Sequence, residues 1–342
     1  MQINIVFDAS VANAPADFTK TVLAVANYYA TTFGDSATLN LNVGYGEVAG
    51  SALPSGALGA SSTYLASLGY STLVNALKGD ASSAADSSAV ATLGADPTHG
   101  LGHYWVSTAE AKALGFSVGS GSDGSIGFSS SSNFFYDSTH TLPVPTGAYD
   151  FYATVAHEFS EVMGRMLLAG ERIGPYRNSY SALDLFHYAS KGVRDLLGTK
   201  AGYFSVNGGA TDLHNFNTNP SGDFGDWASS GSAPADAFNA FANSGVNEPI
   251  STADLTALDA IGWSLAGTTS ANGTTNSSAA TVTSIQQAAG AQDIHGLLGH
   301  ADLHAGDVLA SLGLGQGLGV GQGLFGVGQG LFQTDLSYYY GA

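Results

Sequence analysis

The chain lacks cysteine and has few basic residues. Its 342 residues include no Cys, which excludes disulfide bonds, cysteine-ligated zinc and thiol catalysis. Nine Lys and Arg stand against 27 Asp and Glu, for a net charge of −18, and no basic residue follows Lys200. Nucleic acids and anionic membrane surfaces are bound by clusters of Lys and Arg. We therefore expect neither of them as a partner.

Long hydrophobic runs are also missing. No run of about 18 apolar residues occurs, so the sequence predicts no membrane insertion. The first residues, MQINIVFDAS, have no basic residue before a short apolar run, which is not the pattern of a cleaved signal peptide. The acidic, Gly-rich, Cys-free composition suits a bacterial protein that is exported by another route. We expect a secreted, extracellular protein without a cleaved amino-terminal signal.

The composition changes near residue 267 and predicts three parts. Residues 1–266 have enough apolar side chains for a globular core. Residues 267–284 are rich in Ser, Thr and Asn, as linkers are. Residues 285–342 form a Gly-rich tail in which GQGL occurs three times. We expect the tail to be separate from the domain and to act as a secretion signal.

Local patterns in residues 1–266 predict strands and helices in alternation. Strands are expected at residues 3–7, 38–48, 125–129 and 203–206. Helices are expected at residues 17–33, 63–77, 80–93, 108–114, 183–188 and 254–261. The strongest helix signal covers Tyr149–Leu168, where apolar residues recur at helical spacing between Asp150 as N-cap and Gly170 as C-cap.

This strongest helix contains the sequence HExxE at residues 157–161. Residues four apart lie on one face of a helix, so His157 and Glu161 could bind the same metal ion. Glu158 lies beside them, where a carboxylate could take a proton from an attacking water molecule. The motif therefore predicts a metal-dependent hydrolase. The alternative interpretation is a solvated polar face on an amphipathic helix.

The segment around this motif, VAHEFSEVMGR, resembles the signature of a family of bacterial secreted zincin-type metalloproteases. Other segments are similar to that family as well: INIVFD, VGYGEV, AEAKALG, DLFHY, GVRDL, NFNTNPSGDFGDWA and DLTALDAIGW. The resemblance covers most of residues 1–263 and leaves the tail out. It implies an α+β, zincin-like (metzincin-related) domain with a mixed sheet and an active-site helix. It also implies a metal-dependent endopeptidase that acts on protein or peptide substrates.

The third metal ligand does not follow from the motif. In the metzincin pattern HExxHxxGxxH, Gly164 falls on the glycine, but Leu167 stands where the third histidine would be. We expect Asp184 to complete the site. This arrangement resembles that of gluzincins, in which a carboxylate on a following helix is the third ligand. His187 is the alternative third ligand. Arg165 is expected to pair with a carboxylate near the end of the helix.

The expected ligands suggest which ions the protein binds. One His and two carboxylates suit Zn²⁺, and Mn²⁺ and Fe²⁺ remain alternatives. A second ion, Ca²⁺, is suggested by oxygen-bearing side chains spaced as in a calcium loop. Those side chains belong to Asn217, Asn219, Ser221, Asp223 and Asp226. Ordinary turn chemistry explains the same residues.

A function of another class remains open. The domain could be a secreted structural or adhesive module that holds its metal for stability and has no turnover. Glu158 favours the enzyme, because a structural metal site needs no general base. Metal analysis and a peptidase assay with and without a chelator separate the two.

The tail leads to a prediction about export. We expect a type I secretion apparatus to read the carboxy-terminal segment, although the GGxGxD repeats common in its substrates are missing. Deleting residues 285–342 should leave the protein inside the cell while residues 1–266 still fold. Immunoblots of cells and medium, with limited proteolysis of the retained protein, measure both effects. Normal secretion of the shortened chain would contradict this role.

Overall fold

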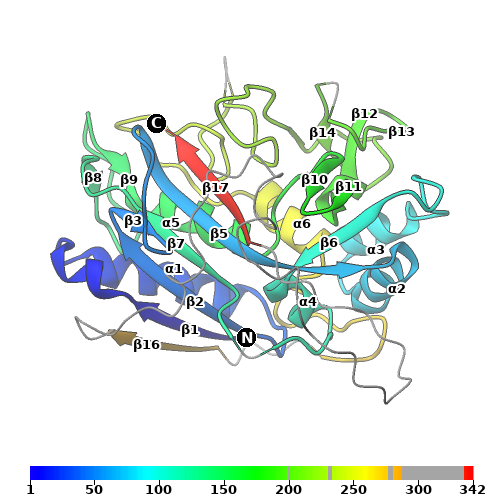
Figure 1. Cartoon of the computed structure of the whole chain (residues 1–342), viewed down its shortest axis with the longest axis horizontal. Coiled ribbons are helices and arrows are strands. Elements are labelled where there is room, and N and C mark those ends of the chain that lie inside the picture. Colours follow the sequence, from blue (N-terminus) through cyan, green and yellow to red (C-terminus); the bar gives the residue numbers. More distant parts are fainter. Residues whose placement is uncertain (120, 199–200, 230–232, 276–279, 287–334, 342) are drawn as a thin grey trace, which may run out of the picture.

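A mixed β-sheet of nine strands forms the centre of the computed structural model (Figure 1). The structure describes residues 1–119, 121–198, 201–229, 233–275, 280–286 and 335–341. The strands of this sheet are β1 (Gln2–Phe7), β2 (Thr38–Tyr45), β5 (Ala57–Leu68), β6 (His103–Ser107), β7 (Gly124–Phe128), β10 (Glu171–Ile173), β11 (Tyr176–Ser181), β16 (Thr281–Gln286) and β17 (Asp335–Gly341). Their order is β10-β11-β6-β5-β7-β2-β1-β16, and β17 pairs with β5 in addition.

The remaining elements are helices and short strands. The helices are η1 (Ala9–Asn13), α1 (Phe18–Thr32), α2 (Tyr70–Asp80), α3 (Ala84–Ala91), α4 (Thr108–Ala113), α5 (Phe151–Val162), η2 (Leu183–Phe186) and α6 (Thr252–Ala260). The short strands are β3 (Glu47–Val48), β4 (Ser51–Ala52), β8 (Phe134–Phe135), β9 (Tyr149–Asp150), β12 (His187–Ser190), β13 (Val193–Arg194), β14 (Tyr203–Phe204) and β15 (His214–Asn215). Of these, β13, β12, β14 and β15 form a second sheet in that order. The mixture of a mixed sheet with helices agrees with the predicted α+β class.

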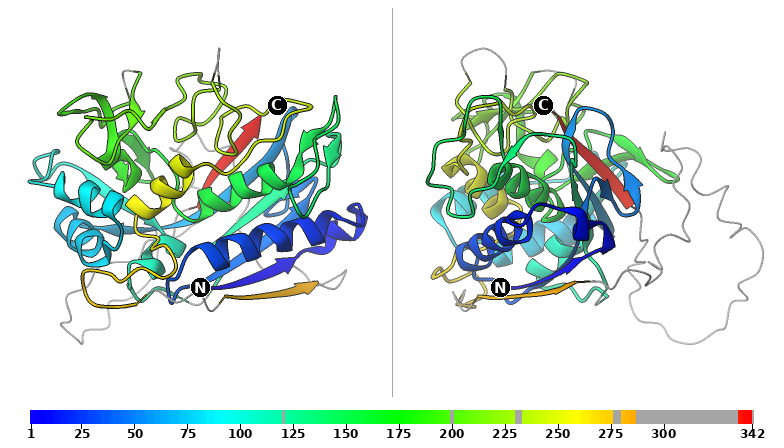
Figure 2. Two further views of the ribbon diagram at one scale, coloured as in Figure 1. Left: turned by 180° about the vertical axis from the view of Figure 1, so that it is seen from behind. Right: turned by 90° about the vertical axis from the view of Figure 1, so that its left-hand side faces the viewer.

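Helices α1 and α5 pack side by side against the central sheet (Figure 2). Phe18, Val22, Val25 and Tyr29 form the buried stripe of α1, as their helical spacing predicts. The Tyr29 hydroxyl donates a hydrogen bond of 2.8 Å to the Ala156 carbonyl, which ties α1 to α5. These contacts fix α5 beneath β5, with which it also packs.

The sheet direction changes at β5. Strands β16, β1, β2 and β7 run parallel to one another, whereas β5 is antiparallel to β7, β6 and β17. Nearly every residue of β5 is buried, on both faces of the strand. Its sequence, ALGASSTYLASL, therefore has no apolar–polar alternation that would mark it as a strand.

Several predicted elements are confirmed, one is wrong and one ends earlier than expected. The strand at residues 3–7 and the helices at 17–33 and 108–114 appear within one or two residues. The helix expected at residues 63–77 is wrong, because β5 continues to Leu68 and α2 begins only at Tyr70. Helix α5 ends at Val162 rather than Leu168, since Gly164 has a φ of +109° and turns the chain.

The central sheet extends beyond the predicted domain boundary at residue 266. Strand β16, which begins in the predicted linker, pairs with β1 in parallel. Strand β17, near the end of the predicted tail, pairs with β5. The GQGL repeats lie outside the described residues. Among the helices that the structure describes, none has the length and apolar character needed to span a bilayer.

The tie between α1 and α5 gives a stability prediction. Tyr29→Phe keeps the buried ring and removes only the hydroxyl, so unfolding should become easier by about 1 kcal/mol. Urea denaturation followed by circular dichroism measures this change. Tyr28→Phe is the matched control, because Tyr28 is only half-buried and should matter less. Equal losses in the two variants would show that the bond to Ala156 contributes nothing specific.

Candidate metal centre

Helix α5 places the HExxE side chains inside the protein. The Asp150 side chain accepts a hydrogen bond from the Ala153 amide and so caps the helix start. Every residue of α5 is buried, including His157, Glu158 and Glu161. The polar face of this helix is therefore not solvated, which contradicts the interpretation of the motif as a surface feature.

A third side chain, Asp226, joins His157 and Glu161 from the loop between β15 and α6. The His157 Nε2 atom lies 3.4 Å from Glu161 Oε1 and 3.3 Å from Asp226 Oδ1. The potential ligand atoms of the three residues lie within 4.8 Å of one another, a grouping found nowhere else in the described residues. Tetrahedral Zn²⁺ with bonds near 2.0–2.1 Å separates neighbouring ligand atoms by about 3.4 Å. The three side chains therefore fit a metal ion.

Hydrogen bonds on the far side of two of these residues fix their orientation. His157 Nδ1 lies 2.9 Å from the Ala237 carbonyl, to which its N–H donates, so Nε2 faces the carboxylates. Glu161 Oε2 accepts a 2.6 Å hydrogen bond from the Ser61 hydroxyl of β5. Glu161 Oε1 is the oxygen nearer to His157. Such outer contacts are typical of metal-binding His and Glu side chains.

Arg165 holds Asp226 in place. Its Nη1 donates to Asp226 Oδ1 at 2.5 Å, and its Nη2 lies 3.6 Å from Glu161 Oε1. The turn at Gly164 makes this possible, because it brings Arg165 back under α5, where Nε donates to the Ser160 hydroxyl at 2.7 Å. The prediction that Arg165 pairs with a nearby carboxylate is confirmed. One oxygen, Asp226 Oδ2, is buried and accepts no hydrogen bond from a described residue.

Glu158 lies next to the three potential ligands. Both of its carboxylate oxygens are buried, and neither has a hydrogen-bond partner among the described residues. It packs against Gly59 of β5, where an added Cβ would collide with the carboxylate. Burial and the neighbouring Glu161 charge raise the pKa of Glu158 well above its usual range. A side chain of this kind is able to take up and release a proton near neutral pH.

The charges of the centre balance when two protons are bound. Burial opposes protonation of His157, but the Asp226 charge outweighs it and raises the pKa of His157 to about 9. With His157 and Glu158 protonated, the positive charges of His157 and Arg165 equal the negative charges of Glu161 and Asp226. A divalent cation adds two positive charges, so it can replace both of these protons.

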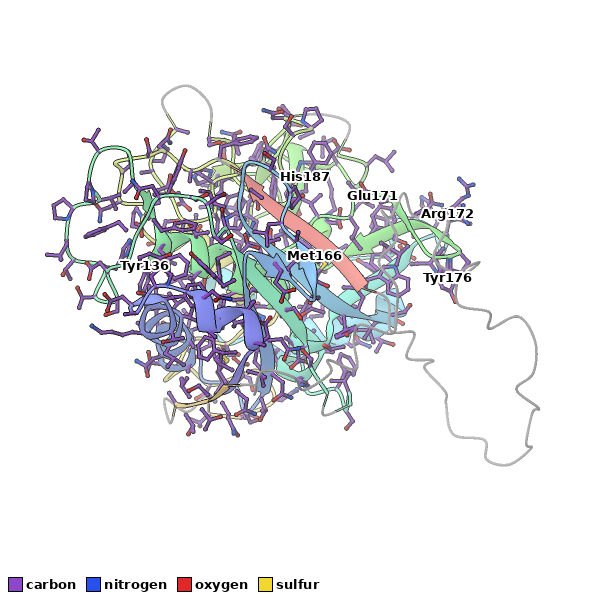
Figure 3. The ribbon with its side chains drawn as sticks, turned by 60° about the vertical axis from the view of Figure 1, so that its left-hand side comes forward. Tyr136, Met166, Glu171, Arg172, Tyr176 and His187 are labelled. Atoms are coloured by element: carbon purple, nitrogen blue, oxygen red, sulfur yellow. The ribbon has the colours of Figure 1, made fainter. Side chains whose placement is uncertain are left out.

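The two predicted third ligands lie elsewhere. The Asp184 carboxylate accepts hydrogen bonds from the amides of Leu168, Ala169 and Ser181, so it organises a turn after α5 rather than joining the group. Burial raises the pKa of Asp184 to about 6 although these hydrogen bonds oppose the rise. His187 is on β12 (Figure 3). Its Nδ1 lies 2.6 Å from the Asp195 carbonyl. Asp226 takes the place expected for Asp184.

The proposed calcium loop is held together by its own hydrogen bonds. The Asn217 amide NH₂ donates to the carbonyls of Asn219 and Asp223, both at 3.0 Å. The amides of Asn219 and Ser221 donate to the side-chain oxygens two residues earlier. These bonds are the turn chemistry of the alternative interpretation. Asp226 also belongs to the His157 group, a place that the sequence did not predict for it.

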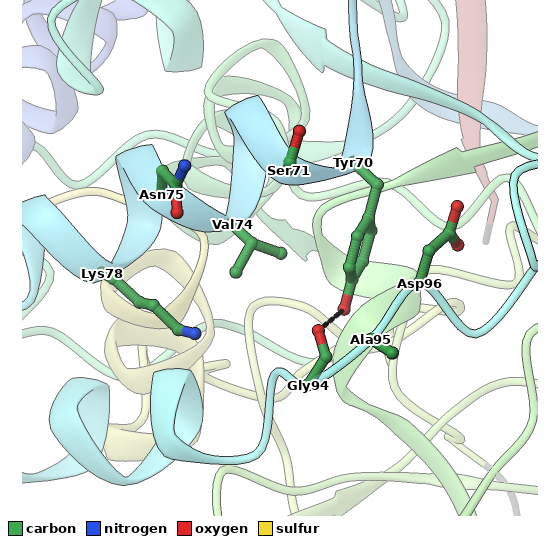
Figure 4. A pocket seen from close by; sticks show the side chains of 8 residues that line it. All are labelled: Tyr70, Ser71, Val74, Asn75, Lys78, Gly94, Ala95 and Asp96. Carbon is green, nitrogen blue, oxygen red and sulfur yellow. Dashed lines mark hydrogen bonds between the residues drawn. The ribbon is translucent and has the colours of Figure 1, made fainter.

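A hollow beside α2 does not belong to this centre. It lies between Tyr70 and Lys78 on one side and Asp96 on the other, and the Tyr70 hydroxyl donates to the Gly94 carbonyl at 3.3 Å (Figure 4). None of the residues that line it belongs to the His157 group. It therefore adds nothing to the chemistry of that group.

Comparisons with known proteins identify no relative of this chain. No family model matches it, and neither does any curated protein or solved structure. The function must therefore be argued from the geometry of the buried group and from the chemistry that its side chains allow.

The geometry predicts which carboxylate binds metal. Asp226→Asn should weaken Zn²⁺ binding by about 100-fold or more, because it removes a charged ligand from a buried site. Asp184→Asn is the control, and it should keep one equivalent of Zn²⁺ while lowering stability. Metal content after dialysis measures both effects. Loss of metal in Asp184→Asn with retention in Asp226→Asn would return the third ligand to Asp184.

The same centre predicts proton release. Zn²⁺ binding at pH 7 should release protons from His157 and Glu158, because the pKa values of both groups are raised in the metal-free centre. Calorimetry in two buffers with different ionisation enthalpies counts them. Glu158→Gln should release one proton fewer than the parent. A release that Glu158→Gln leaves unchanged would contradict the charge balance.

Proposed function

We propose that this protein is a zincin-like, metal-dependent endopeptidase. The observation that carries the proposal is the convergence of His157, Glu161 and Asp226, with an unpartnered Glu158 carboxylate beside them. Zn²⁺ is the ion we expect, because the separations of His157 Nε2 from Glu161 Oε1 and Asp226 Oδ1 suit its tetrahedral coordination. Mn²⁺ and Fe²⁺ accept the same donor atoms.

Each side chain of the centre has a distinct role in this proposal. The bound metal would supply a Lewis acid that polarises the scissile carbonyl and makes the attacking water more acidic. His157, Glu161 and Asp226 hold the ion. Glu158 takes the proton of the attacking water and gives it to the leaving amine. Arg165 fixes Asp226 and keeps the buried charges balanced.

The state of Glu158 favours an enzyme over a structural or adhesive module. A buried carboxylate without a hydrogen-bond partner lowers stability, because burial removes its hydration. A metal site that only stabilises the fold would gain nothing from such a residue. A general base, in contrast, requires a carboxylate of this kind.

Export through a type I apparatus stays a prediction.

Glu158→Gln tests the proposed mechanism. The substitution keeps the size of the side chain and removes the base, so peptidase activity should fall by about 100-fold or more. Metal content and the circular dichroism spectrum should not change. Glu171→Gln, at an exposed position on β10, is the control and should keep full activity. Casein zymography with and without a chelator, followed by peptide kinetics, makes the measurement.

Two outcomes would contradict the proposal. Hydrolysis by Glu158→Gln at the rate of the parent would exclude Glu158 as the base. A metal-loaded parent that hydrolyses no peptide under any condition, including after the release of β17 tested below, would favour the structural module.

A further inference from the structure

Strand β17 occupies an edge of β5 that would otherwise be open. Residues 59–63 of β5 pair with β7, and residues 57–64 pair with β17, so these two partners lie on opposite edges of the strand. On the edge that β17 occupies, β6 pairs only with residues 65–68. Without β17, the first half of β5 would present free amides and carbonyls, to which an extended peptide can add as a strand.

This edge runs beside the metal centre. Gly59 contacts Glu158, and Ser61 donates to Glu161, so alternate residues of β5 face the centre. In the register of the sheet, Tyr340 lies opposite Gly59 and Tyr338 opposite Ser61. Strand β17 also lies against α5 (Figure 1). In this arrangement His157, Glu158, Glu161 and Asp226 are each at most 2% exposed.

A peptidase needs a centre that a peptide chain can reach, and a centre buried to this degree is closed. We infer that β17 is an intramolecular inhibitor, an inference that rests on the proposed function. In this view β17 pairs with β5 at the place where an extended peptide substrate would pair as a strand. Main-chain hydrogen bonds hold a strand of this kind and are indifferent to most side chains. A tethered strand also competes at an effective concentration in the millimolar range. The enzyme is therefore active only when β17 leaves β5.

A reversible crosslink tests this inference in the full chain. Ser62 lies opposite Ser337 in the register, and Ser62 is on the face of β5 away from Gly59 and Ser61. Because the chain has no cysteine, Ser62→Cys/Ser337→Cys can form only one intramolecular disulfide. Oxidation should lower kcat/KM for a peptide substrate by about 10-fold or more, and reduction should restore it. The single variants Ser62→Cys and Ser337→Cys are controls. Neither can form an intramolecular disulfide, so reductant should not change the kcat/KM of the monomer.

A second variant releases the strand. Successive amides of a strand point to opposite edges, so the amide of either Tyr338 or Tyr339 points towards β5. Tyr338→Pro/Tyr339→Pro removes both amides and should raise kcat/KM by about 10-fold. Tyr338→Phe/Tyr339→Phe keeps both amides and is the matched control, with the activity of the parent.

A binding measurement separates the two proposals. A fluorescent synthetic peptide of residues 335–341 should bind to the proline variant and not to the parent, whether or not either hydrolyses peptides. If the peptide binds but no metal-loaded form of the protein hydrolyses peptides, the proposed peptidase function is refuted. The exchange of β17 for another strand on β5 would still stand. If the oxidised and reduced forms of the crosslink variant hydrolyse peptides at equal, metal-dependent rates, inhibition by β17 is refuted. The proposed peptidase function would then be supported.

Discussion

The burial of charge between α5, β5 and the Asp226 loop is the constraint on which the rest of the structure depends. An unpaired charge in a protein interior costs several kcal/mol, so each buried charged group requires a partner. Arg165 meets this requirement for Asp226, with which it forms a direct ion pair. Ser61 and the Ala237 carbonyl orient Glu161 and His157 from two further directions. The site is thus assembled from four separate segments, and none of them could form it alone.

Strand β5 connects this centre to the sheet. Its small residues let α5 approach closely, and Gly59 leaves the space that Glu158 occupies. Strand β6 pairs only with residues 65–68 of β5, so the rest of that edge runs unpaired by β6 beside the centre, and β17 fills it. The chemistry of the centre and access to it therefore depend on the same strand. If the proposed function is correct, β17 accounts for the burial of the centre.

Asp184 and Asp226 show why the third member of the buried group could not be found from the sequence. Both are acidic residues downstream of Glu161 in polar, turn-forming segments. Asp184 is near in sequence, but its oxygens accept three backbone amides after α5. Asp226 reaches the centre because backbone pairing of Trp227 with Phe238 and Ala240 folds its loop against α5. The sequence suggested Asp226 only as part of a calcium loop, and the carboxylate partner expected for Arg165 had no assigned position.

The sequence by itself determined the parts that depend on neighbouring residues. Helical spacing predicted α1 and the shared face of His157 and Glu161, because both follow from the pitch of one helix. The missing cysteines excluded disulfide bonds and thiol chemistry, and the few basic residues led us to expect neither nucleic acids nor anionic membranes as partners. Only the tertiary structure decided the identity of β5, the choice of Asp226 and the place of β17. Each of these depends on contacts between distant segments, where burial on two faces, charge pairing and strand register outweigh local preference.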